Sequence, residues 1–193
     1  MSVVNGLLLF RGMTNKVVLL CYISGEFLFG GPSMFELFKK SKKVDMNIYS
    51  PVDGYCEAIT KCSDGVFSSK MMGDGFLIQP TKNIIKSTCD GEIQMIFPSK
   101  HAVGIKMKDG LEVMIHIGID TVKLNGQGFK QLIKPNTKVQ IGTPLIELDM
   151  DYLQSQNIDL SVIVVMSNEV NGSYQIENLN KKVEAGMRII KRE

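Results

Sequence analysis

The chain has 193 residues, enough for one well-buried domain and additional terminal segments. Its 44% hydrophobic and 22% charged residues are ordinary for a globular protein, and the formal net charge of +2 argues against a nucleic-acid-binding surface. No apolar run reaches the roughly 18 residues that a membrane-spanning helix needs. Because the chain contains only two histidines, any histidine chemistry has just two candidates.

The first 46 residues differ in character from the rest. Residues 1–33 are apolar but lack the periodicity of a helix or a strand, and we expect a non-native or disordered extension there. Residues 34–46 form a basic amphipathic arm with phenylalanines and a leucine among its lysines. We expect residues 34–43 to touch an anionic membrane surface weakly, the alternative being a solvated arm. Residues 47–193 form the expected main domain.

The main domain has the pattern of an all-β protein. Short runs rich in Val and Ile alternate with turn dipeptides, of which Asp109-Gly110 is the strongest hairpin signal. The strands expected in chain order are 55–59, 76–79, 92–97, 102–107, 111–118, 144–147 and 161–165, and short helices are expected at 128–133 and 150–156. So many short strands predict a β sandwich or barrel with one or two short helices.

Two internal repeats indicate that the sandwich is pseudo-symmetric. Residues 50–54 (SPVDG) match residues 87–91 (STCDG). Residues 138–146 match residues 182–190 in a Lys-Val pair, a glycine and two later apolar residues. Each repeat places a glycine-containing turn beside an apolar strand, so we expect turn–strand units that fold onto one another.

The two histidines are expected to lie close together. Strand alternation puts His116 on the face opposite its apolar odd-numbered neighbours. Pairing back from the turn at Asp109-Gly110 places His101, at the start of the neighbouring strand, opposite residue 117 or 118. The alternative is a pair of unrelated structural histidines, which is the commoner role of a lone histidine.

A pair of neutral imidazoles supports two chemistries. One is metal binding, for which an incidental zinc ion on His101 and His116 is the example. The other is phosphorylation, in which one ring nitrogen attacks phosphorus and the second histidine donates to the phosphoryl oxygens. Gly118 would let another backbone segment approach closely, or would orient a backbone amide toward the anion. Asp74 and Asp120 are flanking acids that would receive arginines from a partner, although a simple turn also explains the Gly-Asp-Gly around Asp74.

Around these residues the sequence resembles the glucose-type IIA components of the bacterial phosphoenolpyruvate-dependent sugar phosphotransferase system. The resemblance extends from about Ile48 to the C-terminus, with several motifs in the family's order. They are MGDG (72–75), IFPSKHA (96–102), HIGIDTVKL (116–124), GQGF (126–129) and VVMSN (164–168). The resemblance implies a mostly antiparallel β sandwich with a shallow apolar depression around the two histidines.

The same resemblance implies a cytoplasmic phosphotransferase component that works through a phosphohistidine and needs no cofactor. It would accept a phosphoryl group from the carrier protein HPr on His116 and pass it to the IIB domain of a sugar permease. His101 would assist the transfer, and Ser99, where the family commonly has threonine, would fix a histidine tautomer. The implied partner-binding residues are Asp74, Phe97, Gly118 and Asp120.

Two other functions remain open at this point. One is a regulatory module that binds protein targets. Phosphorylation would turn an exposed apolar patch into an anionic one and so switch the binding, which is compatible with carrier activity. A lysostaphin-type zinc peptidase would share the spacing of His116 and Asp120, but the chain offers no His-x-His motif and no third histidine ligand.

The resemblance is absent from residues 1–33, and Met34 begins a segment (MFELFKK) similar to the start of free-standing family members. Gly30-Gly31 can be encoded by a GGAGG run at the spacing of a ribosome-binding site. We therefore expect translation to start at Met34, the alternative being a genuine extension that is an anchor or the remnant of an upstream domain.

Overall fold

The computed structural model describes residues 7–11, 17–21, 45–168 and 172–193, which belong to two units, residues 1–43 and 44–193. In the first unit, β1 (Leu7–Arg11) and β2 (Val17–Cys21) form an antiparallel pair. Leucine- and valine-rich runs form strands once they have a partner, even where the sequence shows no clear periodicity. That residues 1–33 are a non-native or disordered extension stays a prediction. The expected start at Met34 and the membrane contact of residues 34–43 lie outside the described residues.

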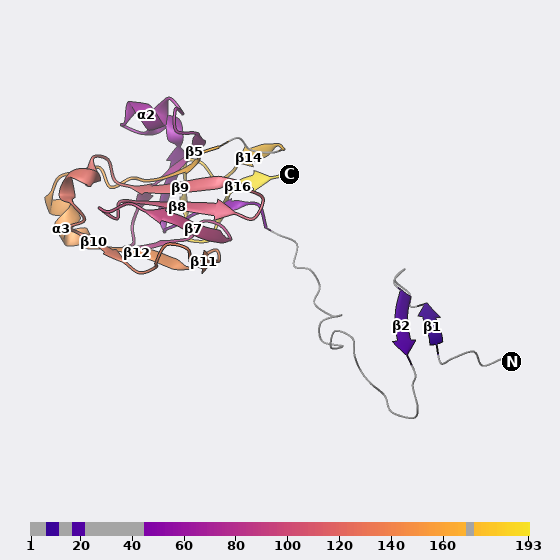
Figure 1. The fold of residues 1–193 in the computed structure, drawn as a ribbon. Helices are drawn as coiled ribbons and strands as arrows, with labels where there is room; N and C mark the ends of the chain where they lie inside the picture. Colours follow the sequence, from indigo (N-terminus) through magenta and orange to yellow (C-terminus); the bar gives the residue numbers. More distant parts are fainter. Residues whose placement is uncertain (1–6, 12–16, 22–44, 169–171) are drawn as a thin grey trace. The chain divides into compact units, whose positions relative to one another are not determined.

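The second unit is built from three antiparallel sheets (Figure 1). The largest has eight strands in the order β11-β7-β8-β9-β13-β5-β4-β15. Their bounds are Gly54–Ala58 (β4), Asp74–Pro80 (β5), Gly91–Ile96 (β7), Ala102–Met107 (β8), Glu112–Ile117 (β9), Lys138–Val139 (β11), Val162–Met166 (β13) and Lys181–Val183 (β15). The expected strands at 55–59, 76–79, 92–97, 102–107, 111–118 and 161–165 are all confirmed in this sheet.

Two three-stranded sheets complete the β structure, in the orders β10-β12-β6 and β14-β16-β3. Their strands are Ile48–Tyr49 (β3), Ile84–Lys86 (β6), Phe129–Gln131 (β10), Pro144–Leu148 (β12), Tyr174–Ile176 (β14) and Arg188–Arg192 (β16). The helical segments of this unit are short: Ile59–Lys61 (η1), Gly65–Ser68 (α2), Thr121–Leu124 (η2) and Met150–Ser155 (α3). The mostly antiparallel, all-β architecture is therefore confirmed.

The main hydrophobic core lies between the large sheet and the two small ones. It joins Ile115 of β9 and Ile93 of β7 to Ile85 of β6 and Ile190 of β16, all fully buried. Burying each such side chain stabilises the fold by about 1.5–3 kcal/mol. Because this core takes the odd-numbered side chains of β9, the even-numbered ones, His116 among them, are left on the outer face of the sheet.

Strand β13 is buried on both faces, which explains its unbroken apolar sequence VIVVM. Val162 and Val164 belong to the main core, whereas Ile163 and Val165 belong to a second, smaller cluster on the outer face. That outer cluster also contains Phe67 of α2, so the short helix lies against the outer face beside β9. The helix and the outer cluster form the floor of the site described below.

The predicted repeats occupy equivalent positions in the fold. The hydroxyls of Ser50 and Ser87 each donate to the carbonyl oxygen two residues on, at 2.7 and 2.8 Å. The carboxylates of Asp53 and Asp90 each accept a backbone N–H from the later repeat, at 2.8 and 3.0 Å. Strands β4 and β7 begin directly after these aspartates and pair with β15 and β11, respectively. The turn–strand units are thus pseudo-symmetric, as the sequence predicted.

One expected helix is wrong. Residues 128–133 contain strand β10, whose Phe129 is buried and pairs with Leu148 of β12. Gly128 has a φ of +81°, which interrupts a helix at its first residue. The other expected helix, at 150–156, is confirmed as α3, where the Asp149 carboxylate caps the N-terminus by accepting the N–H of Tyr152 at 3.0 Å.

Candidate functional site

The β8–β9 hairpin brings the two histidines together. Ala102 lies opposite His116, and the N–H of Ile117 donates to the carbonyl of His101 at 2.7 Å, which confirms the expected register. The centroids of the two imidazole rings are 4.9 Å apart, and the ring planes are nearly perpendicular at 78°. The histidines are therefore neighbours, as the hairpin predicted.

His101 is held by its own loop. Its Nδ1 atom lies 2.6 Å from the Ser99 hydroxyl, and its ring lies against Phe97 with centroids 5.4 Å apart. Burial lowers the pKa of His101 below its ordinary value, so the imidazole is neutral at neutral pH. With Nδ1 bound to Ser99, the tautomer and the ring orientation of His101 are restricted.

His116 is partly buried against α2. The ring of Phe67 lies 5.0 Å from its imidazole, centroid to centroid. Burial, and to a smaller extent the neighbouring His101, lower the pKa of His116 to about 4, although the charge of Asp64 and the backbone of Gly118 act in the opposite direction. Its Nδ1 atom is buried and makes no hydrogen bond of good geometry with the described residues. His116 is consequently a neutral imidazole at neutral pH.

The turn after His116 is tightly built. Gly118 has a φ of +72°, and its N–H donates to the carbonyl of Ser161 at 2.9 Å. A side chain at Gly118 would overlap Thr121, whose buried hydroxyl donates to the carbonyl of Ile117 at 2.6 Å. Asp120 also has a positive φ of 60°, and its exposed carboxylate pairs with Lys123 at 2.7 Å. The turn therefore requires glycine at 118 and presents Asp120 to solvent close to His116.

The Gly-Asp-Gly motif has a structural explanation. A Cβ atom at Gly73 or Gly75 would overlap the backbone of β13, so the close approach of β5 and β13 demands both glycines. The Asp74 carboxylate accepts hydrogen bonds from Lys70 at 2.9 Å and from the Tyr174 hydroxyl at 2.8 Å. Burial raises the pKa of Asp74, but these hydrogen bonds outweigh it and leave the pKa lowered.

Strand register separates Asp74 from the histidines. His116 pairs with Ile163 of β13, and Ile163 pairs with Leu77 of β5, so Asp74 lies further along β5. Its carboxylate is already engaged within the domain. The structure thus brings Ser99, His101, His116, Gly118 and Asp120 to one end of the β8–β9 hairpin, but it does not bring Asp74 to that position.

Sequence reasoning missed two residues at the site, Asp64 and Phe67. Helix α2 has only four residues, too few for a helical period to show. The available signal was the N-cap, because Asp64 accepts the N–H of Val66 at 2.7 Å. No sequence pattern indicates that this turn packs onto His116, since that contact depends on the course of distant strands.

Several exposed apolar side chains lie on the elements that hold the histidine pair or directly adjoin it. Val66 lies on α2, and Met71 and Met72 follow this helix. Val122 lies in η2, and Met95 lies on β7. Met71 is the most exposed, at 78%. Met95 covers Gly104, which is paired with Met114 on the same face as His116. An apolar surface with Asp64 and Asp120 beside the histidines is suited to a protein partner.

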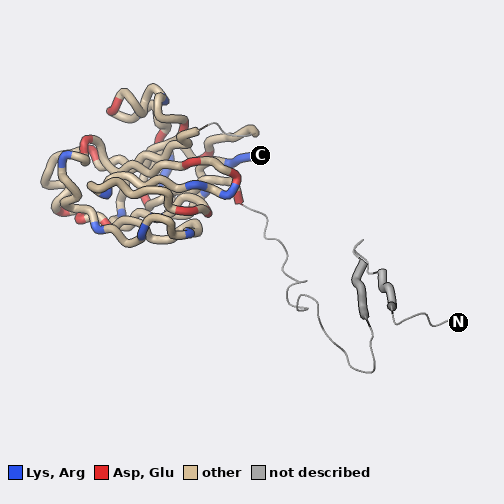
Figure 2. The backbone as a smooth tube through the Cα atoms, in the orientation of Figure 1, with Lys and Arg blue, Asp and Glu red and all other residues tan. Residues whose placement is uncertain are grey.

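Features that would point to another kind of site are missing from the described residues. Among them, no group of three or more His, Cys, Asp or Glu is arranged to hold a metal ion. The helices of the described part are all too short or too polar to cross a membrane. Figure 2 shows Lys and Arg interspersed with Asp and Glu along the backbone of the β domain, and not gathered in one segment as a nucleic-acid-binding region would have them.

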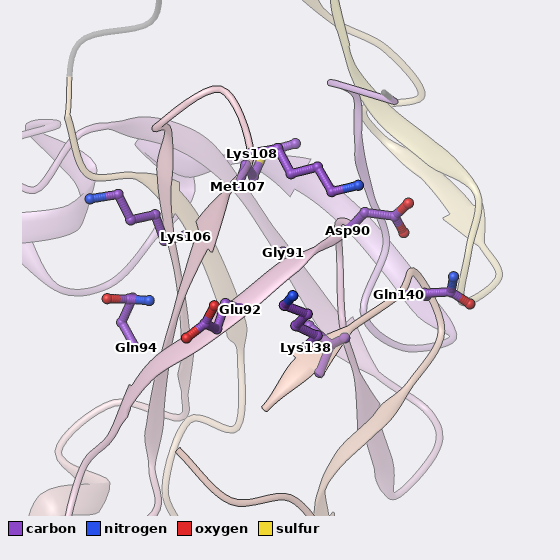
Figure 3. Close-up of a pocket in the computed structure, with 10 residues that line it drawn as sticks. Asp90, Gly91, Glu92, Gln94, Lys106, Met107, Lys108, Lys138 and Gln140 are labelled. Carbon is purple, nitrogen blue, oxygen red and sulfur yellow. The ribbon is translucent and has the colours of Figure 1, made fainter. Parts of the chain in front are cut away.

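A surface pocket of about 350 Å³ lies between β7, β8 and β11 (Figure 3), and neither histidine lines it. Lys106, Lys108 and Lys138 line it together with Asp90 and Glu92. Three lysines face two acids in this pocket, so its net charge is small, and no histidine or cysteine lines it.

Comparison with known proteins agrees with this arrangement. Residues 46–171 match the family model of the phosphoenolpyruvate-dependent sugar phosphotransferase system, EIIA 1. The glucose-specific EIIA component of Staphylococcus epidermidis is 39% identical over 158 residues, which cover 80% of this chain and 95% of that protein. The glucoside-specific EIICBA component of Staphylococcus carnosus is 41% identical over 144 residues, covering 74% of this chain and 20% of that longer protein.

A solved structure extends the agreement to the fold. The glucose permease IIA from Mycoplasma capricolum superposes with a TM-score of 0.71 at 30% identity, covering 75% of this chain and 94% of that one. The family model, the curated relatives and this structure all confirm the resemblance drawn from the motifs. The chain therefore belongs to the EIIA 1 family of the phosphoenolpyruvate-dependent sugar phosphotransferase system.

Proposed function

We propose that the chain is a cytoplasmic phosphoryl carrier that accepts a phosphoryl group from phospho-HPr on His116 and passes it to the IIB domain of a sugar permease. Family membership supports carrier function, and relatives that join EIIC, EIIB and EIIA in one chain support a IIB domain as the acceptor. The observation that carries the residue assignment is the neutral His116 imidazole on the outer face of the large sheet, with its ring centroid 4.9 Å from that of a second neutral imidazole.

The state of His116 suits a nucleophile. A neutral ring keeps a lone pair on one nitrogen, and because Nδ1 is buried, Nε2 is the atom left to attack phosphorus. As the Nε2–P bond forms, the bond between phosphorus and the donor nitrogen breaks, and its electron pair stays with the imidazole of the donor. Onward transfer to the IIB domain is the same displacement with His116 as the leaving group.

His101 is proposed to stabilise the phosphoryl group in transit. If the Ser99 hydroxyl donates to Nδ1 of His101, the ring proton sits on Nε2 and can be donated to a phosphoryl oxygen. A positioned donor of this kind accelerates transfer by about 10²-fold or more. Ser99 thus acts through His101, which explains why a hydroxyl residue at this position is useful.

The partners are proposed to dock on the apolar surface around the histidines. Phe97 and the exposed side chains near α2 would contact an apolar patch on HPr or IIB, while Asp64 and Asp120 would meet arginines. Asp64 joins the acids that the motifs suggested, since its charge acts on His116. Asp74, whose carboxylate also binds Lys70 and Tyr174, stays a proposed partner-binding residue. Such contacts would be short-lived, as a shuttling carrier requires.

The test is phosphoryl uptake from labelled phospho-HPr, followed by transfer to several purified IIB domains. Wild-type protein should take up label that is acid-labile and alkali-stable, and peptide mapping should place it on His116. His116→Ala should lose uptake with its fold intact by circular dichroism. His101→Ala, the matched control, should still accept label but transfer it about 10²-fold more slowly.

Two results would contradict the assignment. One is acid-stable label, or a labelled peptide without His116. The other is equal loss of uptake in the two folded alanine variants, which would remove the unequal roles of the two histidines.

A binding role toward regulatory targets would use the same apolar surface and the same phosphorylated His116, so it accompanies this proposal. The peptidase alternative has no support in the ligands available around His116 and Asp120.

A further inference from the structure

Asp159 lies in the loop between α3 and β13 and belongs to none of the motifs that point to phosphoryl transfer. One oxygen of its carboxylate accepts hydrogen bonds from both the N–H and the hydroxyl of Ser161. The other oxygen accepts the hydroxyl of Ser63 at 2.9 Å. Gln79 of β5 donates to the Ser161 hydroxyl at 2.7 Å, so that hydroxyl has its own proton free for Asp159.

Every side-chain contact of Asp159 is with a donor, so the network needs the carboxylate in its ionised form. Burial raises the pKa of Asp159, but the hydrogen bonds from Ser161 and Ser63 outweigh it and leave the pKa lowered. Hydrogen bonds to a charged acceptor are stronger than neutral ones, and a chain of donors that ends on a carboxylate strengthens each member. Asp159 is therefore the anchor of this loop.

Asp159 and its hydrogen-bond partners connect to two segments next to His116: the turn that follows it and helix α2. On one side, the backbone carbonyl of Asp159 accepts the N–H of Ile119 at 2.8 Å, and Ser161 accepts the N–H of Gly118 at 2.9 Å. These two bonds fix the turn that directly follows His116. On the other side, Ser63 directly precedes Asp64, the N-cap of α2, whose Phe67 packs on the His116 ring.

We propose that Asp159 is a positioning residue for the phosphoryl-accepting site, tying α2 and the turn after His116 to one carboxylate. The inference rests on the proposed role of His116 and adds a residue that acts through others and touches no substrate. The groups facing His116 itself are Phe67, His101 and Asp64, so Asp159 influences its ring through their placement.

The consequence is a defined change at His116 when the anchor is removed. Without it, α2 loosens, Phe67 covers the ring less well, and water reaches the imidazole. A less buried imidazole is protonated more easily, so the pKa of His116 should rise from about 4 toward the ordinary value of 6.5. A small misplacement of reacting groups also slows transfer steeply, so uptake from phospho-HPr should fall about tenfold in Asp159→Ala.

The experiment uses the full chain and three readouts: the NMR titration of His116, hydrogen exchange of the α2 amides, and phosphoryl uptake. Asp159→Ala should raise the pKa of His116 and speed exchange several-fold at Ser68 and Ser69, whose N–H groups donate the backbone hydrogen bonds of α2. Ser63→Ala removes only the exposed link to α2, and it should speed the same exchange about twofold while the turn after His116 keeps its wild-type protection. Ser63→Thr retains the hydroxyl and should restore wild-type exchange.

Asp149→Ala is the matched control, because it also removes a capping carboxylate, from α3, at a similar expected cost in stability. It should leave the His116 titration unchanged. The inference is overturned if Asp159→Ala and Ser63→Ala leave the titration and the α2 exchange at wild-type values, or if Asp149→Ala shifts them equally. If the wild type takes up no phosphoryl group, the proposed function fails, and the titration and exchange data still decide the role of Asp159.

Discussion

The depressed pKa of His116 links the stability of the fold to pH. In the unfolded chain the imidazole binds a proton near the ordinary value of 6.5, whereas in the folded protein it stays neutral down to about 4. Between those two values the unfolded state binds more protons than the folded state, so the free energy of unfolding falls as pH falls. Below about pH 4 both states are protonated, and His116 causes no further loss.

The magnitude follows from the size of that shift. Each pH unit between the two pKa values is worth about 1.4 kcal/mol. Lowering the pH from about 7 to about 5 should therefore cost the wild type about 2 kcal/mol more than His116→Gln, in which this titration is absent. The comparison cancels the contribution of every other group, because those groups are common to both proteins.

The assay is urea unfolding of both proteins at the two pH values, with the His116 titration followed by NMR in the folded wild type. His101→Gln is the matched substitution, and it should reduce the pH dependence less, because the burial of that ring shifts its pKa less strongly. An equal loss of stability in the wild type and in His116→Gln would refute the reasoning. A His116 titration near 6.5 would do the same.

Three further substitutions test other contacts. Ser99→Ala should slow transfer to a IIB domain about tenfold by freeing the His101 tautomer, and Ser99→Thr should restore the rate; equal rates in both would remove this role. Gly75→Ala should cost about 3 kcal/mol or more in urea unfolding, because its Cβ atom would overlap the β13 backbone; a neutral effect would show that the strands can separate. Asp109→Ala should cost about 3–5 kcal/mol of stability, because it leaves the Arg192 charge, 2% exposed, without the carboxylate that lies 2.7 Å away. Arg192→Met should cost less, and the reverse order would contradict a desolvated ion pair.

The histidine pair could be predicted from the sequence because its geometry is local. Asp109-Gly110 forces a tight hairpin, and once the turn is placed the register of β8 and β9 follows residue by residue to His101 and His116. Ser99 could be placed for the same reason, since it lies two residues from His101 on the same chain segment. Motif resemblance then added the chemistry that geometry alone left open.

The rest of the site depends on contacts between distant segments, which no local pattern carries. Asp64 and Phe67 reach His116 because β5 and β9 both pair with β13. Asp74 lies elsewhere because the same pairing places Leu77, and not Asp74, in line with His116. The three-residue strand β10 was mistaken for a helix since so short a segment shows no period, and its partner β12 alone decides its conformation.

Strands β15 and β16, near the end of the chain, determine when this domain can complete its sheets during synthesis. Ile48 of β3 pairs with Ile190 of β16, and Cys56 of β4 pairs with Lys181 of β15. Strands β3 and β4, the first of the second unit to be synthesised, must therefore wait for β16 and β15, and β4 has only β5 beside it until then. Such non-local pairing makes folding slow and leaves strand edges of the nascent chain open to wrong partners. The domain is thus a candidate for protection by a chaperone until residues 181–192 have emerged.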